Sequence, residues 1–303
     1  MNILVTGVNG FVGAHLTNEL KNAGHGVYGA GREAEVSDDL SANLKDYIQV
    51  DLAEDFPKFK DSIDAVIHLA GLAAVGPSFD NPQQYININS AMITHMCEYF
   101  LTQEKKPRLV IVSSGAVYGS KQPMPIAESG EISFSSPYAV SKVLVENQVA
   151  YYKERGLDCV IARPFNHIGP GQAPGFILPD FYERISTTNE DVIKVGNINT
   201  KRDYTDVRDI VRAYLTLATT PVLADTIYNI CSGQSLAGSE ILNKLKIALE
   251  RPEIAFEVDQ SLVRPTDIPE IIGDSSRLQN ELGWKPSINL SQTIQDFVAS
   301  KRT

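Results

Sequence analysis

The first two-thirds of the chain alternates short apolar runs with longer segments in which apolar residues recur every three or four positions. Nearly continuous apolar runs are typical of strands buried on both faces, whereas the longer periodic segments indicate amphipathic helices. We predict strands at 2–7, 26–31, 64–71, 108–119 and 158–166. We predict helices at 13–24, 87–103 and 137–156.

Alternation of buried strands with helices indicates an α/β fold, in which a Rossmann-type, doubly wound parallel sheet carries helices on both faces. After about residue 166 the pattern changes, and residues 167–181 are rich in Gly and Pro, as in a loop that closes over a site. Strand-like segments, a helix at 206–219 and C-terminal helices follow. We therefore predict a dinucleotide-binding domain over 1–166 and a smaller, partly interleaved substrate-binding α/β domain over 167–303.

Composition narrows the class of protein. The 303 residues carry a formal net charge of −10, which argues against a broad nucleic-acid surface, because such a surface needs a basic face. No apolar run approaches the ~20 residues of a membrane span, and Met1 leads directly into a strand without a signal peptide, so we expect a cytoplasmic protein. The three scattered cysteines, Cys97, Cys159 and Cys231, show neither metal-binding spacing nor a disulfide framework.

The segment VTGVNGFVGAHL carries three glycines, Gly7, Gly10 and Gly13, directly after the first strand and at the start of a helix. Glycines in this context allow a tight turn and a close approach of the backbone to a pyrophosphate. The N-terminus of the helix supplies N–H donors and the positive end of the helix dipole, and Phe11 and Val12 join the glycines in the predicted cofactor-binding set. The segment predicts a dinucleotide cofactor.

The end of the second strand bears on the choice of cofactor. NAD-binding proteins usually place an acidic residue there to accept from the ribose hydroxyls. Here Arg32 can pair with a 2′-phosphate, which favours NADP(H), while Glu33 can serve a ribose, which keeps NAD(H) open. Asp51, followed by Leu52, can reach the adenine amino group or can cap a turn.

Tyr138 and Lys142 stand four positions apart on one helix, which holds their side chains together. A free tyrosine titrates near ~10, and a neighbouring ammonium favours the phenolate, so we expect Lys142 to lower the pKa of Tyr138. Ser114 ends the strand before this helix and can hold a substrate oxygen. A cofactor, a proton donor and an orienting hydroxyl are the parts that hydride chemistry at a carbonyl needs.

The glycine loop, HLAG (68–71), SSGAVYG (113–119) and the Tyr138/Lys142 pair occur in this order, and with them the chain resembles the extended short-chain dehydrogenase/reductase family, in its sugar-nucleotide branch. The resemblance covers nearly the whole chain and implies Ser114, Tyr138 and Lys142 as the catalytic group. It implies a homodimer that pairs helices 87–103 and 137–154. It also implies that Tyr138 and Lys142 contact the cofactor. The other residues that it implies as cofactor contacts are Leu69, Ala70, Gly71, Asn89, Arg163 and Pro164.

Members of this family use a hydride step for 4-epimerisation, 4,6-dehydration, or net reduction or oxidation of a keto-sugar. The family's dehydratases carry an Asp-Glu pair directly after the hydroxyl residue, whereas Ser114 is followed by Gly115 and Ala116, which cannot move a proton. We interpret the remaining acid candidates, His68 and Glu128, as structural or surface residues. Dehydration is therefore disfavoured.

Three segments resemble the family's reductases of GDP-4-keto-6-deoxymannose: RPFNHIGPGQ (163–172), GNINTKRDYTDVRDIVRAY (196–214) and RPTDIPEIIGDSSRL (264–278). The resemblance implies NADPH-dependent reduction of the C4 ketone to GDP-D-rhamnose or its C4 epimer. An NAD-dependent nucleotide-sugar 4-epimerase stays open, because it needs little beyond the same groups. A non-catalytic NADP(H)-binding regulatory protein also stays open, although such proteins often lose the Tyr or the Lys.

Candidate substrate residues come from these segments. Asn166 follows a strand end near which a sugar would face the nicotinamide. Arg202 and Arg264 carry guanidinium groups, which match diphosphate oxygens with two parallel hydrogen bonds. Ser114, Pro179 and Lys201 complete the predicted substrate-binding set, although Lys201 is expected to face solvent.

Overall fold

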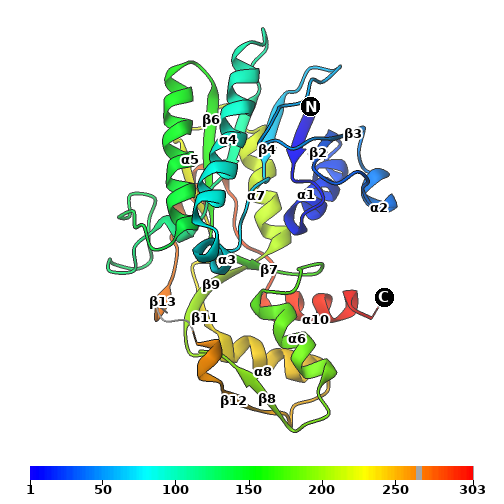
Figure 1. Ribbon diagram of the computed structural model, residues 1–303, viewed down its shortest axis with the longest axis vertical. Helices are drawn as coiled ribbons and strands as arrows, with labels where there is room; N and C mark the ends of the chain where they lie inside the picture. Colours follow the sequence, from blue (N-terminus) through cyan, green and yellow to red (C-terminus); the bar gives the residue numbers. More distant parts are fainter. Residues whose placement is uncertain (264–267, 303) are drawn as a thin grey trace.

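The structure is a computed structural model that describes residues 1–263 and 268–302. Figure 1 shows a large sheet flanked by helices and, below it, a smaller unit of short strands and helices. None of the helices in the described part of the chain is long and apolar enough for a membrane crossing.

The large sheet has seven strands, and all neighbouring pairs are parallel. In spatial order they are β10 (Ile227–Ile230), β6 (Asp158–Pro164), β5 (Arg108–Val112), β4 (Ala65–His68), β1 (Asn2–Thr6), β2 (Gly26–Gly31) and β3 (Asp46–Gln49). The chain runs outward from β1 to β3 and then crosses to β4 on the other side of β1. This reversal opens a crevice at the carboxyl ends of β1 and β4, where doubly wound sheets bind their ligands.

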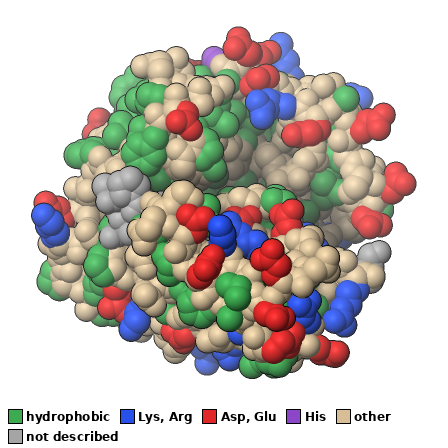
Figure 2. All heavy atoms as spheres, turned by 60° about the horizontal axis from the view of Figure 1, so that its bottom comes forward, with side chains coloured by type: hydrophobic (Ala, Val, Ile, Leu, Met, Phe, Trp, Pro, Cys, Tyr) green, Lys and Arg blue, Asp and Glu red, His purple; other side chains and the backbone are tan. Residues whose placement is uncertain are grey.

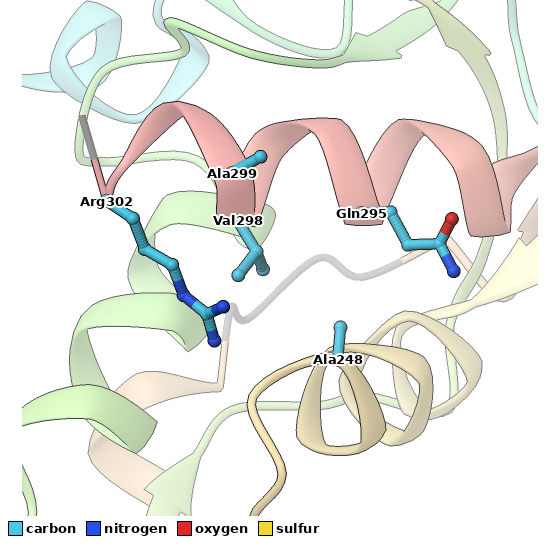
Figure 3. A pocket seen from close by; sticks show the side chains of 5 residues that line it. All are labelled: Ala248, Gln295, Val298, Ala299 and Arg302. Carbon is cyan, nitrogen blue, oxygen red and sulfur yellow. The ribbon is translucent and has the colours of Figure 1, made fainter.

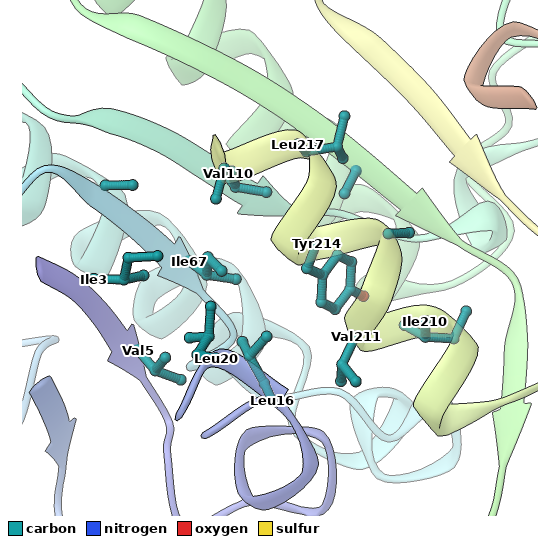
Figure 4. Close-up of a cluster of buried hydrophobic side chains, with 14 of the residues drawn as sticks. Ile3, Val5, Leu16, Leu20, Ile67, Val110, Ile210, Val211, Tyr214 and Leu217 are labelled. Carbon is teal, nitrogen blue, oxygen red and sulfur yellow. The ribbon is translucent and has the colours of Figure 1, made fainter. Parts of the chain in front are cut away.

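Helices cover both faces of this sheet (Figure 1). They are α1 (Phe11–Asn22), α2 (Asp38–Ser41), α4 (Pro82–Leu101), α5 (Pro137–Glu154), α7 (Val207–Thr219) and α9 (Ser276–Leu282). The short helix α3 (Val75–Asp80) packs against α4 and α5. Side chains of β1 alternate between the faces: Ile3 and Val5 pack with α1 and α7, and Leu4 packs on the side of α4 and α5. Figure 4 shows the first of these clusters, with Tyr214 of α7 lying over the sheet. The predicted Rossmann-type fold class is confirmed.

Among the predicted elements of the large sheet and its helices, the bounds of α4 and β5 differ most from the prediction, and each for a local reason. Helix α4 begins at Pro82 instead of residue 87, because proline suits the first turn of a helix, where its missing N–H is not needed. Strand β5 ends at Val112, and Ser114 then caps the short 3₁₀ helix η1 (Gly115–Val117) by accepting from the N–H of Ala116 at 3.1 Å. The predicted strand over 108–119 was therefore too long, and its last residues form a turn at the carboxyl edge of the sheet.

The smaller unit lies beyond the carboxyl end of β6. Strand β9 (Lys201–Asp206) pairs with β7 (Asn166–Ile168), β11 (Ser235–Ala237) and β13 (Glu270–Ile271), and β8 (Val192–Val195) pairs with β12 (Ala255–Val258). Helices α6 (Ile177–Thr187), α8 (Gly238–Ala248) and α10 (Leu290–Ser300) pack on a shared apolar core, and η2 (Gln260–Leu262) follows β12. The predicted loop over 167–181 was wrong in part, because its end forms α6 around the buried Leu178 and Phe181.

Two elements that follow residue 166 in the sequence belong to the large sheet in space. Helix α7 and strand β10 follow residue 166 in the sequence, but α7 packs on the large sheet and β10 forms its edge beside β6. A division into domains at residue 166 stays a prediction.

Candidate active site

The glycine loop joins β1 to α1 at the crevice. Gly7 has a φ of +69°, and a Cβ there would lie 2.9 Å from the backbone nitrogen of Ala70. A Cβ at Gly13 would lie 2.5 Å from the carbonyl oxygens of Gly7 and Val8, so only glycine lets α1 start this close to the strand. The first N–H groups of an α-helix have no partner within the helix, and at α1 they belong to its first residues, Phe11 and Val12. This cradle fits the pyrophosphate of a dinucleotide.

The loop after β4 lies against the glycine loop. The N–H of Ala70 donates to Oγ1 of Thr6 at 3.3 Å, and that oxygen is also bonded to Nδ1 of His68 at 2.8 Å. Burial, with a smaller contribution from the charge of Lys142, lowers the pKa of His68 to about 3. His68 is therefore a neutral structural residue that ties β4 to β1. Leu69 and Ala70 place their backbone beside the cofactor cradle.

Asn89 holds this loop to the catalytic helix. Its Oδ1 accepts from the N–H of Leu72 at 2.8 Å, and its Nδ2 donates to the carbonyl of Leu72 at 3.1 Å and to Oγ of Ser141 at 3.0 Å. Gly71 has a φ of +149°, and a Cβ there would lie 2.9 Å from Oδ1 of Asn89. The buried amide of Asn89 thus positions the loop, and its predicted contact with the cofactor stays a prediction.

Arg32 and Glu33 have different surroundings at the end of β2. The carboxylate of Glu33 accepts from Nδ2 of Asn9 in the glycine loop at 2.9 Å, and its carbonyl accepts from the hydroxyl of Tyr47 at 2.7 Å. The side chain of Arg32 is exposed, while its carbonyl accepts from Nε2 of Gln49 at 3.1 Å. Both residues therefore lie where the adenosine ribose of a cofactor is expected.

Asp51 is exposed and its Oδ1 accepts from the N–H of Ala53 at 3.0 Å, so its carboxylate caps a turn. Leu52 is buried in the core on the side of α4. Contacts from these two residues to adenine stay a prediction.

Ser114, Tyr138 and Lys142 meet where the end of β5 adjoins the first turns of α5. The hydroxyl groups of Ser114 and Tyr138 are hydrogen-bonded to each other. The ammonium of Lys142 donates to the carbonyl of Val112 at 2.8 Å and lies 5.9 Å from the centroid of the Tyr138 ring. Tyr85 of α4 packs edge-on against Tyr138, with ring centroids 6.4 Å apart. The structure thus brings the three predicted catalytic residues together.

Burial dominates the electrostatics of this group. It raises the pKa of the Tyr138 phenol, and the hydrogen bond from Ser114 opposes that rise only in part. Burial also lowers the pKa of Lys142 to about 8, against the opposing effect of the Glu146 carboxylate. The pKa of Tyr138 is therefore raised, whereas we expected it to be lowered, because the cost of burying a phenolate is the largest effect on this group. At neutral pH the phenol keeps its proton and Lys142 is mostly charged.

Arg163 makes its contacts within the protein. Its Nε and Nη2 donate to the two carboxylate oxygens of Glu146 at 2.9 and 2.6 Å, and its Nη1 donates to the hydroxyl of Tyr118 at 2.7 Å and to the carbonyl of Glu128 at 3.2 Å. The guanidinium is buried and hydrogen-bonded on three sides, and the predicted contact of Arg163 with the cofactor stays a prediction. Sequence reasoning missed Glu146, although its place four residues after Lys142 was a usable signal.

The predicted substrate residues other than Ser114 have different surroundings. Asn166 and Lys201 are exposed at the starts of β7 and β9. Arg202 donates from Nη1 to the carbonyls of Lys201 at 2.8 Å and Ile268 at 2.7 Å, which ties β9 to the chain before β13. Pro179 is buried in the first turn of α6, and its predicted contact with the substrate stays a prediction. Arg264 lies outside the described residues.

The molecular face that presents the smaller unit is hollowed near its centre (Figure 2). Hydrophobic side chains gather on one side of the hollow, and acidic and basic side chains gather on the other (Figure 2).

A separate cavity of about 400 Å³ lies between α8 and α10 (Figure 3). It is lined by Ala248, Gln295, Val298, Ala299 and Arg302, none of which is a predicted site residue. Within residues 1–263 and 268–302, no group of three or more His, Cys, Asp or Glu side chains is arranged to hold a metal ion.

A doubly wound sheet, a glycine cradle and a Ser–Tyr–Lys group at one crevice define a nicotinamide-dependent oxidoreductase of the short-chain dehydrogenase/reductase class. The family model described as GDP-mannose 4,6 dehydratase matches residues 4–297, and the chain belongs to this family of nucleotide-sugar enzymes. The predicted family is confirmed.

Relatives with known names match over nearly the full length. The chain is 31% identical over 304 residues to GDP-6-deoxy-D-mannose reductase from Pseudomonas aeruginosa, covering 98% of this chain and 96% of the relative. The structure of RMD from Pseudomonas aeruginosa complexed with NADPH matches with a TM-score of 0.83 and 28% identity, covering 100% of this chain and 99% of that one. A UDP-glucose-4-epimerase from Stenotrophomonas maltophila with bound NAD matches with a TM-score of 0.85 and 25% identity, covering 100% and 98%.

Proposed function

We propose that the protein reduces the C4 ketone of GDP-4-keto-6-deoxy-D-mannose with NADPH, forming GDP-D-rhamnose or its C4 epimer. The observation that carries the proposal is a complete Ser114–Tyr138–Lys142 group with no acid beside the serine, since Gly115 and Ala116 follow it. The similarity to GDP-6-deoxy-D-mannose reductase over 98% of the chain supports the same reaction.

Each catalytic side chain has a definite task in this reaction. When bound, the reduced nicotinamide supplies the hydride. Tyr138 donates the proton to the C4 oxygen, and burial keeps its phenol protonated until then. Ser114 donates a hydrogen bond to the same oxygen and so orients the ketone. Lys142 is mostly charged at neutral pH, stabilises the phenolate left behind and holds the ribose next to the nicotinamide.

Dehydration needs an acid that moves a proton from C5 and water from C6. The two candidates near the sheet are used otherwise. His68 is bonded to Thr6, and the carboxylate of Glu128 accepts from the N–H of Asn229 at 2.9 Å and lies 3.6 Å from Nε of Arg277. The matching family model is named for a dehydratase, but the reaction that we propose for this chain is reduction.

Cofactor choice depends on Arg32 and Glu33. We assign NADP(H), because a guanidinium directly after β2 is suited to pair with a 2′-phosphate and because the similar RMD structure contains NADPH. The carboxylate of Glu33 beside the glycine loop favours NAD(H) instead. This observation makes an NAD-dependent nucleotide-sugar 4-epimerase the second candidate.

A homodimer through the outer sides of α4 and α5 is part of the proposal. Tyr151 of α5 is a large side chain that is 54% exposed in the single chain. Sedimentation analysis of the purified protein tests this assembly, and a monomer at micromolar concentration would contradict it.

The deciding experiment is NADPH oxidation by the purified protein with freshly made GDP-4-keto-6-deoxymannose, with NADH and the dTDP-linked keto-sugar as comparisons. Rapid oxidation with the GDP sugar alone is the expected result. Interconversion of UDP- or GDP-hexoses without net oxidation of the cofactor would establish the epimerase. Binding of NADPH without turnover of any of these sugars would establish a non-catalytic regulatory protein.

A further inference from the structure

Glu146 lies two helical turns after Tyr138 and one turn after Lys142, on the same face of α5. Its Oε1 accepts from Oγ of Ser113 at 2.5 Å and from Nε of Arg163 at 2.9 Å, while Oε2 accepts from Nη2 of Arg163 at 2.6 Å. The side chains of Arg163 and Glu146 are only 4% and 10% exposed. One carboxylate therefore connects α5 to the ends of β5 and β6.

We propose that Glu146 is a positioning residue of the site, which fixes the serine-bearing end of β5 against the catalytic helix and keeps a negative charge next to Lys142. Ser113 directly precedes Ser114, so its hydrogen bond to Glu146 sets the position of the catalytic serine relative to Tyr138. The proposal rests on the proposed function only for its kinetic readout.

Arg163 extends this arrangement into the core. It lies over the ring of Tyr118, 4.9 Å from the ring centroid, and the Tyr118 hydroxyl donates to Oδ1 of Asn229 at 2.6 Å. Nδ2 of Asn229 donates to the carbonyls of Ile126 at 2.9 Å and Asp274 at 3.1 Å. Because such a buried network is fully bonded, it holds the carboxylate of Glu146 in one orientation.

Lys142 is surrounded by groups from several elements, and their charges decide its protonation. These are the buried neutral His68 of β4, the Val112 carbonyl of β5, and Tyr138 and Glu146 of α5, with Arg163 of β6 beyond Glu146. Burial lowers the pKa of Lys142, and the negative charge of Glu146 raises it. If the carboxylate is made neutral, Lys142 and Arg163 remain as two buried cations, and Lys142 will lose its proton at lower pH.

The test is the pKa of Lys142 in Glu146→Gln, followed by the ¹³Cε chemical shift of the lysine during a pH titration and assigned with Lys142→Met. We expect the pKa to fall by about one unit from the wild-type value. Glu98→Gln is the matched control. It removes an exposed carboxylate of α4 that is paired with Arg155, and we expect it to leave the pKa of Lys142 unchanged. An unchanged or higher pKa in folded Glu146→Gln would overturn the proposal.

The kinetic readout is the pH profile of kcat with NADPH and the GDP-linked keto-sugar. In Glu146→Gln the loss of activity at high pH is expected to begin about one unit lower, with a roughly tenfold lower kcat at neutral pH. A lower kcat with an unshifted profile would mean a structural role alone. No turnover by the wild type would contradict the proposed function, while the titration of Lys142 would still decide the role of Glu146.

If Glu146→Gln does not fold, Glu146→Asp takes its place. This variant keeps the charge but shortens its reach by one methylene, so the pKa of Lys142 is expected to fall by a smaller amount. Ser113→Ala removes one hydrogen bond and leaves the charge, and we expect it to lower kcat without moving the pKa. A Glu146→Asp protein that is folded and titrates like the wild type would overturn the electrostatic part of the proposal.

Discussion

The catalytic half and the substrate half of the site are built in different ways. At the carboxyl edge of the large sheet, polar side chains are buried and bonded to one another, as Thr6 is to His68 and Glu146 is to Arg163. In the smaller unit the predicted substrate residue Lys201 is exposed at the start of a strand. Buried, mutually bonded groups cannot reorient without losing hydrogen bonds, whereas exposed side chains settle around whatever they bind.

This difference indicates which half of the site determines kcat and which half determines KM. Groups that are held in place before the substrate arrives act on the chemical step and therefore on kcat. We expect the exposed groups of the predicted substrate half to contribute to binding and therefore to KM. Substitutions in the catalytic half are therefore expected to change mainly kcat, and substitutions in the substrate half mainly KM.

The largest expected effect is in the catalytic half. Tyr138→Phe removes the hydroxyl that we propose as the proton donor and is expected to lower kcat by about 10³-fold, while the affinity for NADPH changes less than about threefold. Stopped-flow turnover and NADPH fluorescence titration measure the two quantities. Tyr151→Phe, on the exposed side of α5, is the control and should have normal turnover. Near-normal turnover of Tyr138→Phe would remove this residue from the mechanism.

A second variant tests how rigid the cofactor cradle is. Gly13→Ala places a methyl group 2.5 Å from two backbone carbonyl oxygens and is expected to lower the free energy of unfolding by about 2–3 kcal/mol, measured by urea denaturation. Gly76→Ala is the matched control, since a Cβ there has no neighbour within 4 Å, and its effect should stay within about 0.5 kcal/mol. Equal stability of the two variants would show that the cradle accommodates the added methyl group, and the proposed rigidity of the catalytic half would be wrong.

The smallest expected effect is in the substrate half. If Arg202 binds the diphosphate as predicted, Arg202→Ala should raise KM for the GDP sugar about tenfold and change kcat less than about threefold, because a charge-assisted bond would be lost. Arg202→Lys keeps the charge but not the two parallel hydrogen bonds, so its KM should lie between those of the wild type and Arg202→Ala. Lys244→Ala on α8, in the same unit, is the control. A fall in kcat with unchanged KM would place Arg202 with the catalytic half and break the comparison.

Much of the fold and part of the site were predictable because they depend on local spacing. Continuous apolar runs identified β1, β4 and β6 to within three residues at either end, and the glycine spacing located the cradle. The roles of Asn89 and Arg163 were not predictable in detail. Their partners, Leu72, Ser141 and Glu146, lie 17 to 52 positions away in the sequence, and only the packed chain shows which polar groups are already bonded.

The sequence alone determined that Tyr138 and Lys142 share a helix face, since four residues make about one helical turn. Only the tertiary structure decided how they titrate: burial between the sheet and α4 raises the pKa of Tyr138 and lowers that of Lys142, against what an exposed pair would do. Only the tertiary structure placed β10 beside β6 and Glu146 beside Arg163. Periodicity and spacing are local properties of the chain, whereas solvation and long-range pairing exist only once the chain has folded.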